Sequence, residues 1–127
     1  MNSIELFSGT GGLALGLQQA GFDHKALFEW DKASCENIKE NIANGYPGVR
    51  DWKVYQTDVR TVNYNGYTGS IQLVAGGPPC QPFSLGGKHQ AYNDKRDMFP
   101  EAVRAVRETQ PEAFIFENVK GLLRKSF

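Results

Sequence analysis

The stretch SIELFSGTGG, residues 3–12, runs from a short apolar segment into a glycine-rich turn, and it decides the fold class of the chain. Residues 3–7 are typical of a buried strand. Residues 11–20 follow as a predicted helix, with Leu13, Leu17 and Ala20 on one face. Glycines between them allow positive φ and a close approach of the backbone to a ligand. A strand, a tight turn and a helix in this order indicate the first unit of an α/β fold.

The same alternation continues along the whole chain. Further strands are predicted at residues 26–30, 52–56, 71–75 and 113–117, with a turn-rich segment at 63–69. A helix from residue 32 to about 44, capped by Asp31, would bury Cys35, Ile38 and Ile42; a helix from about 97 to 109 would bury Phe99, Ala102, Val103 and Val106. This pattern predicts a parallel sheet covered by helices, which binds ligands at the carboxyl ends of its strands.

Composition sets limits on the class of protein. The chain has 127 residues, 40% of them hydrophobic, and 14 Lys+Arg balance 14 Asp+Glu. This excludes a strongly basic nucleic-acid module and fits one small domain. No apolar run approaches the roughly 20 residues of a membrane helix, and no signal segment opens the chain. Cys35 and Cys80 are too few for a zinc site or a disulfide framework, so we expect a cytoplasmic protein without a metal.

The glycine turn resembles a nucleotide-binding turn. Gly9, Gly11 and Ala14 fit a relaxed G-x-G-x-x-A pattern, and Glu29 stands where a ribose-binding acid is expected. An NAD-type cofactor, S-adenosylmethionine and a tight turn without a ligand all remain open from this pattern. Asp58, after the third strand, could accept from an adenine amino group. Trp30 could stack on the adenine, or it could be a half-buried core aromatic.

The segment GGPPCQPFS, residues 76–84, holds one cysteine between prolines at the ligand-binding edge of the sheet. Prolines fix φ and stiffen the loop on both sides of Cys80. Cys35 lies within a helical apolar pattern and suits a structural role, whereas Cys80 suits a nucleophile, which must be accessible and reach the thiolate form. A cysteine–histidine dyad with His24 or His89 is a weaker alternative.

An acid ends the fifth predicted strand. Glu117 follows the apolar residues 113–116, so we expect it to be partly desolvated. Desolvation raises a carboxyl pKa and suits proton donation near neutral pH. The alternative is an acid at the N-terminus of a helix over residues 120–124. Because the fourth and fifth strands are expected to be neighbours, Cys80 and Glu117 could flank one small, flat substrate.

These segments together resemble a known family. Residues 7–12 (FSGTGG), 77–84 (GPPCQPFS) and 116–119 (FENV) look like the ordered signature motifs of the cytosine-C5 DNA methyltransferases. Residues 29–31 (EWD), 58–59 (DV) and 96–99 (RDMF) resemble the intermediate motifs. The resemblance covers nearly the whole chain. Glu5 and Ser8 depart from it, since the family often has Asp and Ala there.

The resemblance implies a Rossmann-like class I S-adenosylmethionine-dependent methyltransferase fold, with about five strands of the family's parallel sheet. It implies that the Cys80 thiolate adds to C6 of a cytosine flipped out of double-stranded DNA, while Glu117 protonates N3 and Asn118 orients the loop or the base. It also implies S-adenosyl-L-methionine as the cofactor. The residues that map onto its contacts are Phe7, Gly9, Gly11, Gly12, Glu29, Trp30, Asp58, Val59 and Pro79.

Other parts of the family's catalytic domain have no counterpart in residues 1–127. The Gln-x-Arg-x-Arg motif, the target-recognition region and the C-terminal segment that closes the cofactor pocket are not found. We therefore expect residues 1–127 to be the N-terminal part of a methyltransferase, a fragment or a split subunit that needs a complementary chain. An RNA cytosine methyltransferase of the related tRNA-modifying branch and a catalytically silent module that binds cofactor or a partner are the alternatives.

Overall fold

The computed structural model describes residues 1–79 and 97–118. Its strands are β1 (Asn2–Leu6), β2 (Asp23–Glu29), β3 (Val54–Gln56), β4 (Leu73–Gly76) and β5 (Ala113–Phe116). Its helices are α1 (Gly12–Gln19), α2 (Lys32–Ala43) and α3 (Phe99–Thr109), with short 3₁₀ helices η1 (Val59–Thr61) and η2 (Asn65–Tyr67). Among these residues, no helix has the length and apolar character that crossing a membrane requires.

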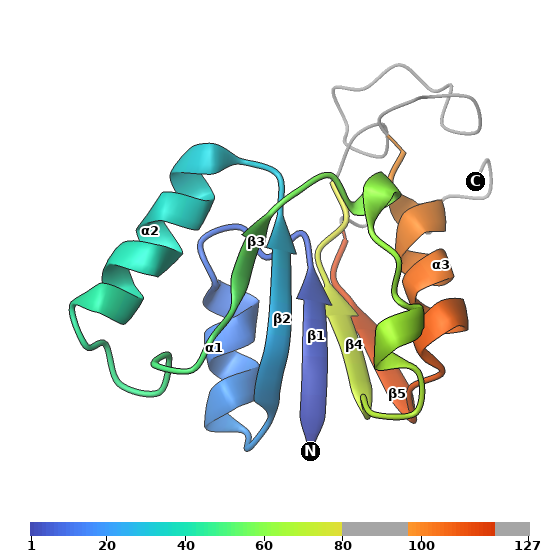
Figure 1. Ribbon diagram of the computed structural model, residues 1–127, viewed down its shortest axis with the longest axis horizontal. Coiled ribbons are helices and arrows are strands. Elements are labelled where there is room, and N and C mark those ends of the chain that lie inside the picture. The colour runs from blue at the N-terminus through green and yellow to red at the C-terminus, as the bar shows by residue number, and fades with distance from the viewer. Residues whose placement is uncertain (80–96, 119–127) are drawn as a thin grey trace.

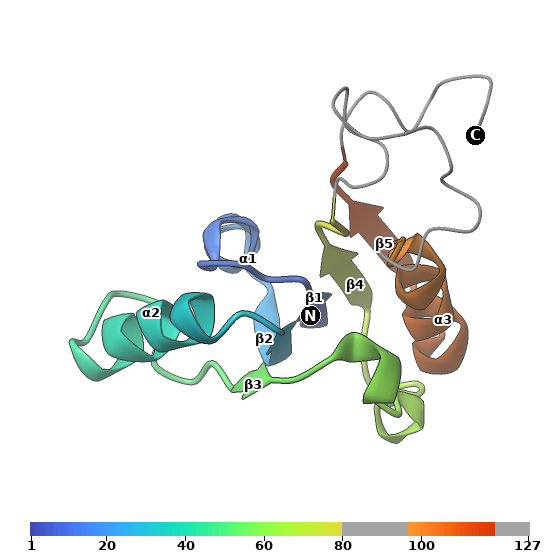
Figure 2. The same cartoon turned by 90° about the horizontal axis from the view of Figure 1, so that it is seen from above.

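The five strands form one parallel sheet in the order β3-β2-β1-β4-β5. Helices α1 and α2 lie on one face, and α3 with the two 3₁₀ helices lies on the other (Figures 1 and 2). All the strands point the same way, so their carboxyl ends share the upper edge in Figure 1. The predicted α/β architecture is confirmed, and this edge carries the candidate site.

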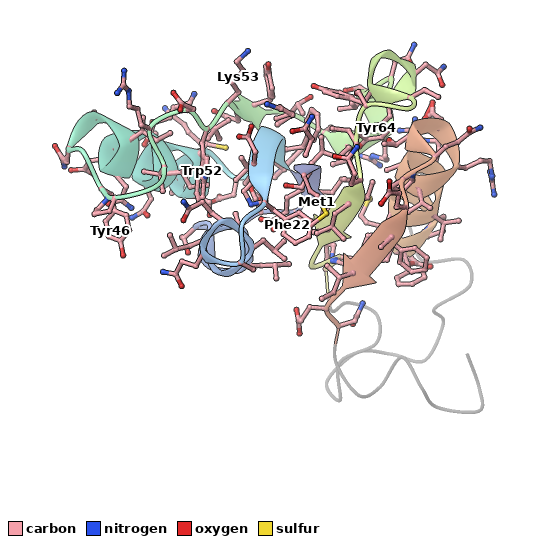
Figure 3. All side chains as sticks on the ribbon, turned by 90° about the horizontal axis from the view of Figure 1, so that it is seen from below. Met1, Phe22, Tyr46, Trp52, Lys53 and Tyr64 are labelled. Atoms are coloured by element: carbon pink, nitrogen blue, oxygen red, sulfur yellow. The ribbon has the colours of Figure 1, made fainter. Side chains whose placement is uncertain are left out.

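The sheet separates two apolar clusters. Ile4, Leu6, Phe28, Val74 and Ala105 belong to the larger cluster, on the α3 face, which also contains the fully buried Tyr64 (Figure 3). Ala14, Leu27 and Ile38 form the smaller cluster beneath α1 and α2. Burying an aliphatic or aromatic side chain contributes about 1.5–3 kcal/mol each, so both layers hold the sheet in place.

The helical faces differ in part from the prediction. In α1 the buried residue is Ala14, whereas Leu13 and Leu17 are half-buried and Ala20 is exposed. In α3 the prediction was wrong for Val103, which is 40% exposed, because the buried face runs through Ala102 and Ala105. Small side chains at these positions let each helix approach the sheet closely.

The third strand begins later than predicted because Trp52 leaves the sheet plane. Its ring packs edge-on against His24, with the centroids 5.5 Å apart. The ring also lies 3.3 Å from the position that a Cβ on Gly11 would take. Gly11 has φ 95°, so both conformation and space require glycine at this turn. Trp52, which lies between α1 and α2 in Figure 3, therefore packs against the glycine turn instead of extending β3.

One irregularity interrupts the pairing of β1 with β2. Ser3 pairs with His24 and Ile4 pairs with Ala26, so Lys25 is an extra residue in β2. Such a bulge reverses which side chains face which side of the sheet beyond it. Ala26 and Phe28 consequently face α3, whereas Leu27 packs beneath α1 and α2.

The strand β5 is less protected than the rest of the sheet. Phe114 is 60% exposed and Ile115 is 46% exposed. Pairing puts Phe114 on the face of Val74 and Ile115 on the face of Ala75, so apolar surface is open on both sides. Within residues 1–79 and 97–118, no further strand pairs beyond β5.

Candidate functional site

The carboxyl edge of the sheet gathers most of the predicted site residues. Phe7 and Gly9 follow β1, Trp30 follows β2, Asp58 follows β3 and Glu117 follows β5. Cys80, the predicted nucleophile, and Val119 lie outside the described residues, as does His89.

The glycine turn begins with a strained residue. Phe7 has φ 55°, a conformation that bulky L residues rarely adopt. Gly9 also has φ 55°, and no atom lies within 4 Å of the position of a Cβ on Gly9 or on Gly12. Strained backbone clusters at functional sites, and here it turns the chain sharply out of β1. Backbone at Gly9 and Gly12 is thus open to a ligand, whereas Gly11 is buried against Trp52.

Glu29 connects the first two loops of the site. Its Oε2 accepts from the backbone N–H of Gly9 at 2.7 Å, and its Oε1 accepts from the N–H of Asp31 at 3.0 Å. One carboxylate therefore fixes the spacing between the glycine turn and the start of α2. Each oxygen retains a lone pair for a ligand hydroxyl. The acid spaced from Gly9 in the sequence does lie at the turn, as the pattern predicted.

A cavity of about 430 Å³ opens between the ends of β2 and β3. Its lining residues are Trp30, Asp31, Lys32, Gln56, Thr57 and Asp58. Trp30 is 68% exposed, so it is not a core aromatic, and its ring is available for stacking. An exposed indole beside carboxylates suits a nucleoside.

Asp58 is already engaged by a neighbouring arginine. Its carboxylate accepts from the backbone N–H of Arg60, from Nε at 3.0 Å and from Nη2 at 2.7 Å. These hydrogen bonds lower the pKa of Asp58, so it stays ionised as an acceptor. Arg60 was not predicted as a site residue, although its position two residues after Asp58, which caps η1, was a usable signal. Val59 buries its side chain, so it can meet a ligand only through its backbone.

Glu117 is placed by the end of β4. Its backbone N–H donates to the carbonyl of Gly76 at 2.9 Å. Its Oε2 lies 3.3 Å from the position of a Cβ on Gly77, so any larger residue there would press on the carboxylate. The side chain is exposed, and the expected partial desolvation by the apolar strand was therefore wrong, because β5 itself is open to solvent. Pro79 is exposed and Asn118 is half-buried.

The other titratable groups near the site have structural surroundings. His24 is buried, with its ring nitrogens 2.8 Å from Ser3 Oγ and from the carbonyl of Ala14, so it is not available for a dyad. Cys35 is buried in α2, and burial raises the pKa of its thiol, which fits the predicted structural role. Within residues 1–79 and 97–118, no three His, Cys, Asp or Glu side chains come together as metal ligands.

Glu5 has an unusual environment. It lies in the central strand, is fully buried, and neither carboxylate oxygen has a hydrogen-bond partner among the described residues. Desolvation raises its pKa from 4.5 to about 8. The only signal for this environment in the sequence is an acid within an apolar strand.

Comparison with known proteins assigns the family. The profile of the C-5 cytosine-specific DNA methylases matches residues 1–127. The chain belongs to this family. A Type II methyltransferase, M.NgoMIV of Neisseria gonorrhoeae, is 46% identical over 98% of the chain and 38% of its own length. M.AquIA of Picosynechococcus sp. is 37% identical over 97% of the chain and 50% of its own length.

Solved structures agree with this assignment. A DNA modification methyltransferase encoded within an Escherichia coli prophage superposes with a TM-score of 0.74 at 36% identity, over 98% of this chain and 34% of that one. The Dnmt2 of Spodoptera frugiperda superposes with a TM-score of 0.67 at 21% identity, over 95% of this chain and 36% of that one. The class I S-adenosylmethionine-dependent methyltransferase fold is therefore confirmed.

The chain spans half or less of the length of each of these relatives. The family and the fold follow from the matched residues. The activity of a whole methyltransferase, its substrate and its partners concern a larger unit than the one described above.

Proposed function

We propose that this chain carries the cofactor-binding and nucleophile-bearing part of a DNA cytosine-C5 methyltransferase. The observation that carries the proposal is that Trp30 and Asp58 line one cavity, Glu29 bridges the adjoining turns, and Glu117 follows β5 next to the end of β4. Membership of the cytosine-specific family supports the same reaction.

The residues of the cavity fit S-adenosyl-L-methionine. In our proposal, the exposed ring of Trp30 stacks on the adenine, Asp58 accepts from its amino group, and Glu29 accepts from the ribose hydroxyls. The open backbone at Gly9 and Gly12 leaves room for the methionine portion. Phe7, Gly11, Val59 and Pro79 complete the proposed set, Gly11 by shaping the turn and Val59 through its backbone. The cofactor supplies a methyl group on a positively charged sulfur.

The chain's own groups prepare the cytosine. The Cys80 thiolate adds to C6 of a cytosine flipped from the duplex, while Glu117 protonates N3 and Asn118 orients the base. The addition makes C5 nucleophilic enough to accept the methyl group. Loss of the C5 proton, expulsion of the thiolate and return of the N3 proton to the Glu117 carboxylate then restore the aromatic ring.

Further methyltransferase residues complete the unit, on a longer chain or on a complementary one. The exposed apolar strand β5 and the share of each relative that the chain covers support this proposal. The partner we propose is double-stranded DNA with a target cytosine. RNA is the alternative substrate.

The test uses the chain together with its missing methyltransferase segments. Duplex DNA with 5-fluorocytosine at the target should trap a covalent adduct in the presence of S-adenosylmethionine, because fluorine cannot leave as a cation. Cys80→Ser should form no adduct, since an alkoxide is far less accessible than a thiolate near neutral pH. The matched control, Cys35→Ser, should still form it. An adduct that survives Cys80→Ser, or methylation of transfer RNA but not of DNA, would contradict the proposal.

A further inference from the structure

One arginine on α3 holds the loop that carries Asp58. The Nη2 group of Arg104 donates to the carbonyl of Val59 at 2.8 Å, and Nη1 donates to the carbonyl of Val62 at 2.9 Å. Val59 opens η1 and Val62 closes it, so one guanidinium binds both ends of this short helix. Asp58 is the N-cap of the same helix.

The guanidinium is itself fixed from three further directions. Its Nε donates to Glu101 at 2.8 Å and Nη1 donates to Glu108 at 2.6 Å, one carboxylate on each side along α3. Its Cζ lies 5.1 Å from the centre of the Tyr64 ring, within cation–π distance. Figure 3 shows Tyr64 between the sheet and α3. Arg104 is only 28% exposed, so solvent weakens these contacts little.

This arrangement exceeds what holding α3 against the sheet requires. Apolar contacts of Ala105 and Val106 already pack the helix on the large cluster. The planar guanidinium of Arg104 instead binds two backbone carbonyls at the ends of η1, more than forty residues earlier in the chain. The compact ammonium group of lysine cannot reproduce this geometry. Because Asp58 caps this turn, the position of the turn determines the position of the Asp58 carboxylate at the cavity.

We propose that Arg104 is a positioning residue for the adenine end of the cofactor site, a role that rests on the function proposed above. It acts through η1: the guanidinium fixes the carbonyls of Val59 and Val62, and the fixed turn holds Asp58 at the cavity. Arg60, which binds the Asp58 carboxylate directly, determines only the local rotamer; Arg104 determines the position of the turn.

The experiment is a double-mutant cycle in the complemented protein, which is the chain together with its missing methyltransferase segments. Calorimetry measures the affinity for S-adenosylhomocysteine. Arg104→Lys should weaken binding about tenfold, the loss expected from breaking hydrogen bonds of a charged group. In an Asp58→Ala background the same substitution should cost less than about twofold, because the group that it positions is gone. Methyl transfer at saturating cofactor should stay near the wild-type rate, so the KM for the cofactor rises without a matching fall in kcat.

Matched controls separate positioning from general stability. Arg107→Lys, on an exposed residue of the same helix, should leave the affinity unchanged. If Arg104→Lys does not fold, Glu108→Gln replaces it and should weaken binding about threefold, again only when Asp58 is present. Equal losses with and without Asp58, or an unchanged affinity in a folded Arg104→Lys, would overturn the inference. A wild-type protein that binds no S-adenosylhomocysteine would overturn the proposed function instead, and the inference with it.

Discussion

The two ends of the candidate site are built to different degrees by the same chain. At the ends of β2 and β3, Glu29 and Asp58 each make several hydrogen bonds within these residues, and a cavity lined by Trp30 and Asp58 opens between the two strand ends. At the ends of β4 and β5, Glu117 is exposed beside an apolar strand that is itself open to solvent. Under the proposed function, recognition of the cofactor is therefore largely local to this part of the fold, whereas recognition of the base needs additional surface.

The largest effect should come from testing residues 1–127 without further segments. We expect no measurable methyl transfer to cytosine DNA, although weak binding of S-adenosylhomocysteine should remain. The exposed faces of Phe114 and Ile115 should also drive self-association. Light scattering and a radiolabelled methylation assay check both points. A stable monomer with steady turnover would remove the contrast between the two ends.

The next effect concerns Glu117. Glu117→Gln in the complemented protein should lower kcat about 10²- to 10⁴-fold, because the amide keeps the shape but cannot deliver a proton. Cofactor affinity should be close to normal, since the side chain lies outside the cavity of Trp30 and Asp58. Single-turnover kinetics combined with calorimetry separate the two quantities. A loss of cofactor affinity at an unchanged kcat would contradict the proposed role and would place Glu117 at the cofactor end of the site.

A smaller effect is expected for Glu29. Glu29→Ala should weaken S-adenosylhomocysteine binding by about 10- to 100-fold, from a lost charge-assisted hydrogen bond worth roughly 1.5–3 kcal/mol. Glu29→Gln is the matched control: it retains one acceptor for Gly9 or Asp31 and should lose less. Titration calorimetry measures the ranking. Equal affinities in the wild type, Glu29→Ala and Glu29→Gln would mean that the glycine turn has a purely structural role.

The last effect is on stability instead of activity, and it lies in the pH dependence of unfolding. Glu5 has a pKa of about 8 in the folded chain against 4.5 in the unfolded one, so folding favours its protonated form. The free energy of unfolding should therefore be highest below about pH 4.5 with respect to this group and should fall by up to about 5 kcal/mol as the pH rises through 8.

Glu5→Gln tests that dependence, because the amide cannot ionise. Urea unfolding between pH 5 and about 8.5 should show a clearly flatter profile for this variant than for the wild type. Glu36→Gln, an exposed acid of α2, is the control and should keep the wild-type slope. Parallel profiles for Glu5→Gln and the wild type would mean that the carboxyl finds a partner or water in solution.

Much of the fold could be predicted because local signals agreed with the tertiary structure. The spacing of apolar residues predicted all five strands, and Asp31 caps α2 by accepting from the N–H of Ser34. The predicted strand and helix boundaries were wrong where long-range packing overrides the local sequence pattern. Trp52 looks like the start of a strand, but it packs against His24 and Gly11, neither of which is near it in sequence.

The candidate site divides in the same way. Glu29 and Asp58 could be predicted because each follows a strand at a meaningful spacing. Arg104 could not, because its two carbonyl partners lie more than forty residues earlier and carry no side-chain signature. The exposure of Glu117 depends on what covers β5. The apolar sequence of that strand does not indicate whether it is covered.

The extra residue at Lys25 has a consequence for how this chain tolerates change in length. Beyond the bulge, the alternation of β2 puts Glu29 on the face of Leu27, from which it reaches Gly9. Substituting Lys25 should matter little, because its side chain is exposed and bonds only Asp23. Deleting it would remove the bulge and make His24 and Ala26 neighbours on opposite faces, as their partners Ser3 and Ile4 already are, so Glu29 would keep its face. Inserting a residue between Ala26 and Glu29 would instead turn the acid toward the opposite layer, so β2 tolerates a loss at Lys25 but not a gain beyond it.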